Sequence, residues 1–165
     1  MPDEKIVLDH QKLRLIISEH KKNGRTVVFT NGCFDLLHVG HIRCLKGAKE
    51  EGDRLVVGVN SDASMMALGK KGRPLMPENE RLEILSSIVY VDYLTVFSDS
   101  TVDNILKTLE PNVFAKGTDY TVEDVPERDT ALAIRARIAI VGDPKDHSSS
   151  GYFTKISKNF REVKD

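Results

Sequence analysis

Two histidines, three positions apart, are the residues whose type and spacing point most directly to chemistry. His38 and His41 flank Gly40 in the segment HVGH, after a short apolar run and at the start of an amphipathic pattern. If a helix begins there, the free N–H groups of its first turn attract anions, and Gly40 lets the backbone come close. Two imidazoles would add hydrogen-bond donors. An isolated pair with this spacing is more often one capping and one packing histidine, but the flanking NGCFD after a buried run favours a phosphate site. A zinc site stays open, although no nearby Cys, Asp or Glu completes a ligand set.

The elements that must position these histidines follow from the periodicity of apolar residues. Helical patterns alternate with short, β-branched runs, which predicts a parallel sheet with helices on both faces. The expected strands are 26–30, 54–60, 91–97, 112–117 and 137–142. The expected helices are 9–22, 39–51, 62–68, 77–88 and 100–111 (the last with a Ser/Thr cap), then a loop plus helix in 121–136 and a short final helix. We expect an α/β fold: one domain over 1–165, with a core of about 26–160 and an N-terminal helix in 1–25.

Polar or glycine-rich segments follow four of the five predicted strands. In parallel sheets, ligands bind beyond the carboxyl ends of the strands, near the point where the strand order reverses. We therefore expect these segments to converge on one site. They are TNGCFD, NSD, AKGTDY and GDPKDHSSS.

Composition excludes several classes of protein. The net charge of −1 gives no global basic field, which argues against a general nucleic-acid binder. No apolar run is long enough for a membrane span, and the N-terminus lacks a signal-peptide layout. The two cysteines, Cys33 and Cys44, are too few for a disulfide framework. We expect a cytoplasmic protein with reduced thiols.

The segment TNGCFDLLHVGH resembles the H-x-G-H signature of the cytidylyltransferase-like nucleotidyltransferase superfamily. The resemblance continues in order through GDRLVVGVNSDAS, GRPLMPENER, VDYLTVF, NVFAKGTDY and SSS, covering roughly 26–160. It implies a Rossmann-like α/β fold, with the parallel five-stranded sheet expected above, and transfer of a nucleotidyl group to a phosphorylated substrate. The chain departs from the pattern in its SSSG motif and in 121–136, which lacks a glycine pair.

Within the superfamily, FTNGCFD, VNSDAS, RP and KGTDY most resemble the heptose 1-phosphate adenylyltransferase branch, in a form without a fused kinase. That branch transfers AMP from ATP to D-glycero-β-D-manno-heptose 1-phosphate, giving ADP-heptose and pyrophosphate. The main competitor, the glycerol-3-phosphate cytidylyltransferase branch, has G-T-F-D where this chain has GCFD, and an arginine where it has Asp143. An FMN adenylyltransferase-like enzyme and a non-catalytic nucleotide-binding domain are further alternatives. The resemblance also implies a homodimer, a separate upstream sugar kinase, no nucleic-acid or membrane partner, and Mg²⁺ bound mainly through the ATP phosphates.

The same resemblance assigns roles to individual residues. The expected catalytic residues are His38, His41, Lys70 and Arg81. The expected nucleotide-binding residues are Asn31, Gly32, Cys33, Phe34, His38, Gly40, His41, Lys116, Gly117, Asp119, Ser148, Ser149 and Ser150. The expected substrate-binding residues are Asp35, Lys70, Lys71, Arg73 and Tyr120, and no protein ligands to a metal are expected.

Purely structural roles remain open for three of these groups. The lysine loop is either a lid over phosphates or a solvated surface run. Asp35 orients the acceptor or a loop amide, or it caps the entry to a helix. The AKGTDY segment contacts ligand, or it is a tight turn that needs Gly117, with Asp119 as a cap.

Overall fold

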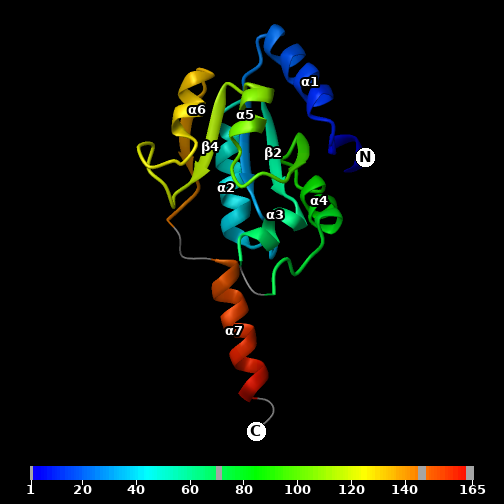
Figure 1. Ribbon diagram of the computed structural model, residues 1–165, viewed down its shortest axis with the longest axis vertical. Coiled ribbons are helices and arrows are strands. Elements are labelled where there is room, and N and C mark those ends of the chain that lie inside the picture. Colours follow the sequence, from blue (N-terminus) through cyan, green and yellow to red (C-terminus); the bar gives the residue numbers. More distant parts are fainter. Residues whose placement is uncertain (1, 70–71, 145–147, 163–165) are drawn as a thin grey trace.

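Five parallel strands form a single sheet at the centre of the molecule (Figure 1). The computed structural model describes residues 2–69, 72–144 and 148–162. The strands are β1 (Val27–Gly32), β2 (Arg54–Asn60), β3 (Tyr93–Phe97), β4 (Val113–Gly117) and β5 (Arg137–Val141), in the order β3-β2-β1-β4-β5. All four pairings are parallel, which confirms the predicted α/β class. The order reverses between β1 and β4, and this is where such sheets bind ligands.

Helices cover both faces of the sheet, because successive strand residues point to opposite sides. On β1, Val27 and Phe29 pack into one core, whereas Val28 packs into the other. The first core includes residues of α1 (His10–Lys22), α5 (Asp103–Leu109) and α6 (Arg128–Ala133). The second includes residues of α2 (Val39–Glu50) and α4 (Glu78–Ser86).

Local sequence signals explain most of the element boundaries. Asp9 caps α1 by accepting hydrogen bonds from the backbone N–H groups of Gln11 (2.8 Å) and Lys12 (3.1 Å), and Gly24 follows its end with a φ of +74°. The segment before α1 forms a 3₁₀ helix (Pro2–Lys5), and Ile6 pairs with Leu94 on β3.

Several predicted boundaries were wrong. β1 runs two residues further than expected, to Gly32, because Asn31 and Gly32 still pair with β2. β3 begins at Tyr93, not at residue 91. The predicted Ser/Thr cap of α5 is absent: Val102 is the cap residue, and Thr101 bonds instead to the Asp103 carboxylate at 2.6 Å.

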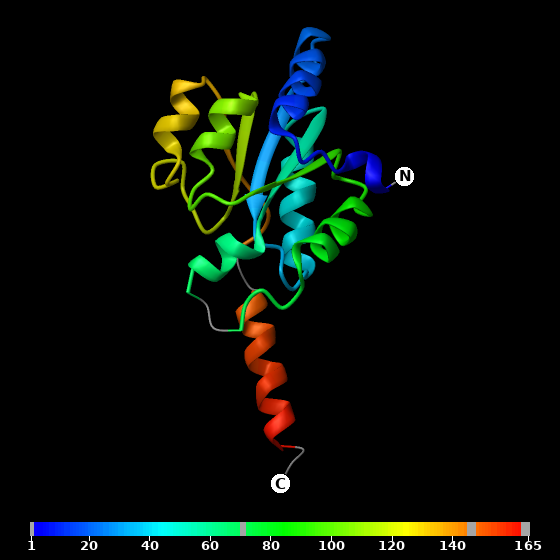
Figure 2. The same cartoon turned by 45° about the vertical axis from the view of Figure 1, so that its right-hand side comes forward.

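The final helix, α7 (Ser149–Glu162), spans 14 residues rather than forming the short helix that the sequence suggested. It projects from the body below the carboxyl ends of the strands, as both views show (Figures 1 and 2). Its first turn contacts the body, since Tyr152 lies 5.8 Å from the His38 ring and Phe153 lies 5.5 Å from the Arg73 guanidinium. The start of α7 therefore belongs to the same region as the histidine pair.

A short helix, α3 (Asp62–Ala67), follows β2 and begins at the cap residue Ser61, whose hydroxyl accepts from the Ser64 N–H at 3.1 Å. Within the described residues, no helix combines the length and the apolarity needed to cross a membrane.

Candidate active site

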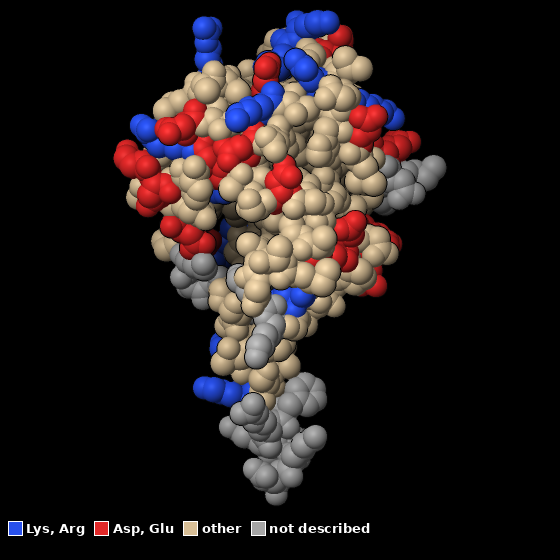
Figure 3. All heavy atoms as spheres, viewed as in Figure 1, with Lys and Arg blue, Asp and Glu red and all other residues tan. Residues whose placement is uncertain are grey.

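A cavity of about 490 Å³ opens where the strand order reverses, at the carboxyl ends of β1 and β4. A hollow with Lys or Arg atoms at its edge is visible above α7 in the space-filling view (Figure 3). The residues that line the cavity come from the β1–α2 segment, the ends of β2, β4 and β5, the α3 region, and the start of α7. The predicted convergence of the strand ends is therefore observed.

Most residues expected at the site line this cavity. These are Asn31, Gly32, Cys33, Phe34, Asp35, His38, Gly40, His41, Arg73, Lys116, Gly117, Asp119, Tyr120, Ser148 and Ser150. Lys70 and Lys71 lie outside the described residues, as does the side chain of Ser149. Arg81 is not among the lining residues.

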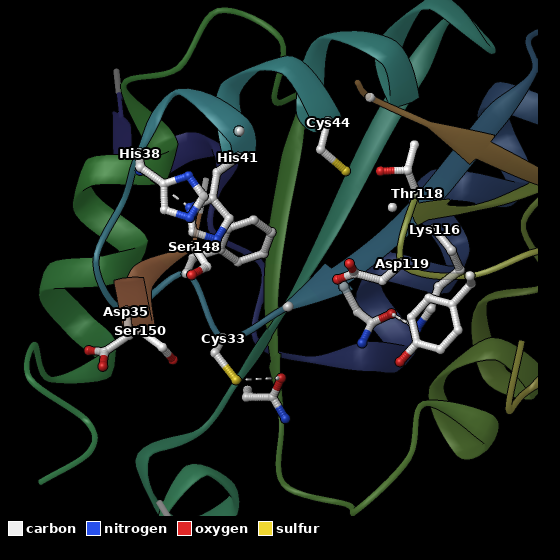
Figure 4. A pocket seen from close by; sticks show the side chains of 18 of the residues that line it. Cys33, Asp35, His38, His41, Cys44, Lys116, Thr118, Asp119, Ser148 and Ser150 are labelled. Carbon is white, nitrogen blue, oxygen red and sulfur yellow. Dashed lines mark hydrogen bonds between the residues drawn. The ribbon is translucent and has the colours of Figure 1, made fainter. Parts of the chain in front are cut away.

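The histidine pair sits at the start of α2, as the sequence predicted. His38 is the residue before the first turn, in an extended conformation (φ −141°), and its carbonyl accepts from the N–H groups of His41 (2.9 Å) and Ile42 (3.3 Å). The two imidazole rings are 3.9 Å apart between centroids and lie side by side above the cavity (Figure 4). This arrangement combines a capping role with a position beside the free N–H groups of a helix, where an anion is stabilised.

His41 is held in one protonation state and one tautomer. Burial, followed by the nearby His38, lowers the pKa of His41 to about 4, so the ring is neutral near pH 7. The backbone N–H of His38 donates to His41 Nδ1 at 3.3 Å. Because Nδ1 accepts, the neutral ring carries its proton on Nε2. His41 can thus donate a hydrogen bond to a phosphate oxygen without carrying a charge.

This pKa predicts a loss of stability in mild acid. Between the ordinary value of 6.5 and about 4, the unfolded chain binds a proton at His41 and the folded chain does not. The free energy of unfolding therefore falls as the pH drops through that window, by about 1–2 kcal/mol from pH 7.5 to pH 5. Urea unfolding at both pH values should show a smaller fall for His41→Gln than for the wild type. Equal falls would contradict the prediction.

The ring of Phe34 packs near the ring of His41. Its φ of +48° is in the left-handed region, which turns the chain sharply after β1. The buried Phe34 ring lies 5.4 Å from the His41 ring, and a Cβ at Gly32 would be 3.0 Å from that ring. A side chain at position 32 would therefore crowd the Phe34 ring, so the packing of this ring favours glycine there.

Asp35 anchors the loop that precedes α4. Its carboxylate accepts from the backbone N–H groups of Leu75 (2.8 Å) and Met76 (3.0 Å) and from the Arg73 guanidinium (2.5 Å). Burial raises the pKa of Asp35, but the hydrogen bonds from Arg73, Met76 and Leu75 outweigh it, so the net shift is downward. Of the roles considered from sequence, the structure shows orientation of loop amides rather than a helix-entry cap.

The catalytic role predicted for Arg81 has no support in this geometry. Its side chain is fully buried, and its guanidinium donates to the carbonyls of Cys33 (2.6 Å) and Met76 (3.2 Å) and to the Asp62 carboxylate (2.7 Å). Arg81 therefore joins α4 to the segment after β1 and to the start of α3. We reassign it from the catalytic set to the support of the cavity wall.

Two further strand ends bring polar groups to the opposite wall. Lys116, at the end of β4, donates to Asn31 Oδ1 at 3.3 Å. The Thr118 hydroxyl donates to the Asp143 carbonyl at 2.7 Å, which ties the β4 and β5 ends together. Ser148 accepts from the Gly151 N–H at 3.0 Å and so caps α7. Its hydroxyl also faces the cavity.

Several lining residues were not assigned individually from the sequence. They are Cys44, Asn60, Met65, Leu68, Thr118, Val141, Gly142, Asp143 and Pro144. Position in the polar segments after the predicted strands could have identified four of these residues as part of the site: Asn60, Thr118, Gly142 and Asp143. Cys44 lies one helical turn after His41, where i, i+3 spacing places it on the same face. Burial raises the pKa of its thiol. Met65 and Leu68 gave no signal, because apolar residues of a short helix read equally well as core.

In the described part of the chain, no three His, Cys, Asp or Glu side chains are grouped so as to hold a metal ion. The zinc alternative for the histidine pair therefore has no support among these residues. A divalent cation accompanying a nucleotide would have to be held largely by phosphate oxygens.

The chain matches a family of known proteins. The cytidylyltransferase-like family model matches residues 29–155, which include the histidine pair, all of β2 to β5 and the first turns of α7. The chain belongs to this family. Nucleotidyl transfer, the class of reaction expected from the H-x-G-H resemblance, is the activity that membership supports.

Curated relatives in the family extend beyond the matched region. The chain is 43% identical over 147 residues to the bifunctional protein HldE of Geobacter sulfurreducens, covering 89% of this chain and 30% of that protein. It is 36% identical over 156 residues to the protein of the same name from Pseudomonas entomophila, covering 94% and 33%. The chain therefore spans about a third of the length of these relatives.

Solved structures agree with the fold. A lipopolysaccharide core biosynthesis protein from Thermoplasma volcanium matches with a TM-score of 0.65 and 29% identity, over 74% of this chain and all of that one. Pantoate-β-alanine ligase from Francisella tularensis matches with a TM-score of 0.61 and 19% identity, over 88% and 69%. The second likeness bears on the fold alone.

Proposed function

We propose that this chain transfers AMP from ATP to a sugar 1-phosphate, with heptose 1-phosphate as the acceptor, and releases pyrophosphate. The observation that carries the proposal is the neutral His41 beside His38 at the start of α2, above a cavity at the reversal of strand order. That placement suits recognition of a phosphate by hydrogen-bond donors and a helix N-terminus.

The proposed reaction is a direct in-line displacement. An oxygen of the sugar phosphate attacks the α-phosphorus of ATP, the bond from that phosphorus to the bridging oxygen breaks, and pyrophosphate leaves with the bonding electrons. The nucleophile is already an anion near neutral pH, so no general base is required. Catalysis then depends on positioning and on stabilisation of the shifting negative charge.

The residues of the cavity divide these tasks. His41 Nε2–H and the His38 ring donate to oxygens of the reacting phosphate, together with N–H groups of the first turn of α2. Lys116 and Ser148 lie on other walls of the cavity, where they can hold further phosphate oxygens. Mg²⁺ held by the nucleotide phosphates would neutralise part of the triphosphate charge.

The choice of acceptor rests on similarity and on one local contact. The relatives named HldE and the lipopolysaccharide core biosynthesis protein fit the heptose branch that GCFD and KGTDY resemble. At the position where the glycerol-phosphate branch carries an arginine, Asp143 forms an ion pair with Arg43 of α2. An arginine at position 143 would face the like charge of Arg43.

A panel of substrates tests the proposal. ATP and CTP are each combined with heptose 1-phosphate, glycerol 3-phosphate or FMN, and pyrophosphate release is measured with Mg²⁺ present. We expect turnover with ATP and heptose 1-phosphate well above every other pair. Reactions without acceptor serve as the control for nucleotide hydrolysis. Turnover with CTP and glycerol 3-phosphate would favour the cytidylyltransferase alternative, and ATP binding without turnover of any pair would favour a non-catalytic domain.

A further inference from the structure

Lys116 is the best-defined cation of the cavity. In the described part of the chain, Arg73 and Lys116 are the Lys and Arg residues that line it, and Arg73 is already bound to Asp35 at 2.5 Å. The Lys116 ammonium lies 5.2 Å from the centroid of the Phe114 ring and 5.0 Å from that of Tyr120. It donates to Asn31 Oδ1, and its side chain is only 9% exposed. An ammonium has three donors, so this contact leaves donors for a ligand.

A buried carboxylate outside the lining of the cavity balances the positive charge of Lys116. Glu127 Oε2 lies 3.5 Å from Lys116 Nζ, and the Glu127 side chain is 6% exposed. Glu127 is not among the residues that line the cavity. It belongs to the segment 121–136, for which the sequence suggested no role in the site.

The backbone of Glu127 is held in place by the start of α6 and by the core beneath it. Glu127 is the residue before the first turn of α6, and its carbonyl accepts from the Ala131 N–H at 2.9 Å. The neighbouring Val125 and Ala131 are buried in the core formed with α1 and α5. The side chain of Glu127 therefore extends from a backbone position that the packed helix holds in place.

The buried charges of Lys116 and Glu127 stabilise each other. Glu127 Oε2 accepts no hydrogen bond from a described group, so the Lys116 ammonium is what compensates its burial. A buried charge left without its partner is costly, and long side chains that lose such a partner take up other rotamers. The Phe114 and Tyr120 rings add favourable cation–π contacts to the ammonium in this position.

From this geometry we infer that Glu127 is a positioning residue for the nucleotide site: it holds the Lys116 ammonium against Asn31, ready to meet a nucleotide phosphate. The inference rests on the proposed function, because it takes the ligand of Lys116 to be a nucleotide phosphate. Glu127 touches no substrate and acts only through Lys116.

A double-mutant cycle on ATP binding tests this role. The variants are Glu127→Gln, Lys116→Met and the double variant, and ATP affinity is measured by calorimetry with Mg²⁺ present. We expect Glu127→Gln to weaken ATP binding roughly tenfold in the wild-type background and to have no further effect when Lys116 is absent. The KM for ATP should rise more than kcat falls, because the ammonium is misplaced before the reaction begins.

The controls separate positioning from stability. Glu123→Gln removes an exposed carboxylate from the same segment and should leave ATP affinity unchanged. Glu127→Asp, which keeps the charge, should recover part of the affinity, and urea unfolding establishes that each variant is folded.

Three results would overturn the inference: unchanged ATP affinity in Glu127→Gln, tighter ATP binding, or equal weakening with and without Lys116. A wild-type protein that neither binds ATP nor releases pyrophosphate would refute the proposed function and this role together. If the wild type is active but Glu127→Gln leaves ATP affinity unchanged, only the positioning role of Glu127 is refuted.

Discussion

Replacing His41 with alanine is expected to lower kcat by about 10²–10³ while the protein stays folded, since that is the usual cost of removing one preorganised donor. His41 is neutral, its Nδ1 is occupied by the His38 backbone N–H, and its Nε2–H is the group left for a phosphate oxygen. The measurement is pyrophosphate release at saturating ATP and acceptor, with the far-ultraviolet circular dichroism spectrum as the test of folding.

Two amide replacements separate the donor from the packing role of this ring. Gln places an amide nitrogen close to the position of Nε2, whereas Asn reaches only as far as Nδ1. His41→Gln should therefore retain more activity than His41→Asn. If both variants and the alanine variant release pyrophosphate at nearly the wild-type rate, His41 is not a phosphate donor. If activity falls only in proportion to the folded fraction, the ring has a packing role alone.

Replacing Arg81 with methionine is expected to lower the free energy of unfolding by about 3 kcal/mol, the lower end of the cost of breaking a buried ion pair. The lower end applies because the side chain of its partner, Asp62, is 31% exposed and can be partly solvated. The variant also leaves the Cys33 carbonyl without its 2.6 Å donor. Urea unfolding at neutral pH measures the change.

Arg14→Met is the matched control for Arg81. Arg14 is an exposed arginine on α1, remote from the cavity wall, and its replacement should change the free energy of unfolding by no more than about 0.5 kcal/mol. An Arg81→Met variant of normal stability with a selectively raised KM for the sugar phosphate would contradict the reassignment. It would restore the catalytic role predicted for Arg81 from the sequence.

The sheet and most of the cavity could be predicted because both depend on local patterns. β-branched runs such as Val27–Thr30 define buried strands, and polar segments after those runs must meet at one edge of a parallel sheet. His38 and His41 were placed correctly for the same reason, since a helix start is a local feature.

The errors come from contacts between residues far apart in the chain. Nothing in the sequence near Arg81 shows that its guanidinium is directed to Cys33, 48 positions earlier, instead of to solvent or a ligand. Glu127 was overlooked because its partner lies on β4 and its own segment has weak periodicity. The length of α7 was underestimated even though Tyr152, Phe153 and Ile156 recur at helical spacing in this segment.

The strand order also constrains how the molecule assembles. Asn31 and Lys116, which meet across the cavity, are separated by 85 positions, and so are Val27 and Asn112, whose hydrogen bond joins the starts of β1 and β4. Closing so long a loop costs chain entropy before any contact repays it. β1, β2 and β3 all lie before residue 98, but this part of the chain supplies only one wall of the cavity. The cavity is therefore complete only when β4 has docked against β1 and has brought Lys116 to face the histidine pair.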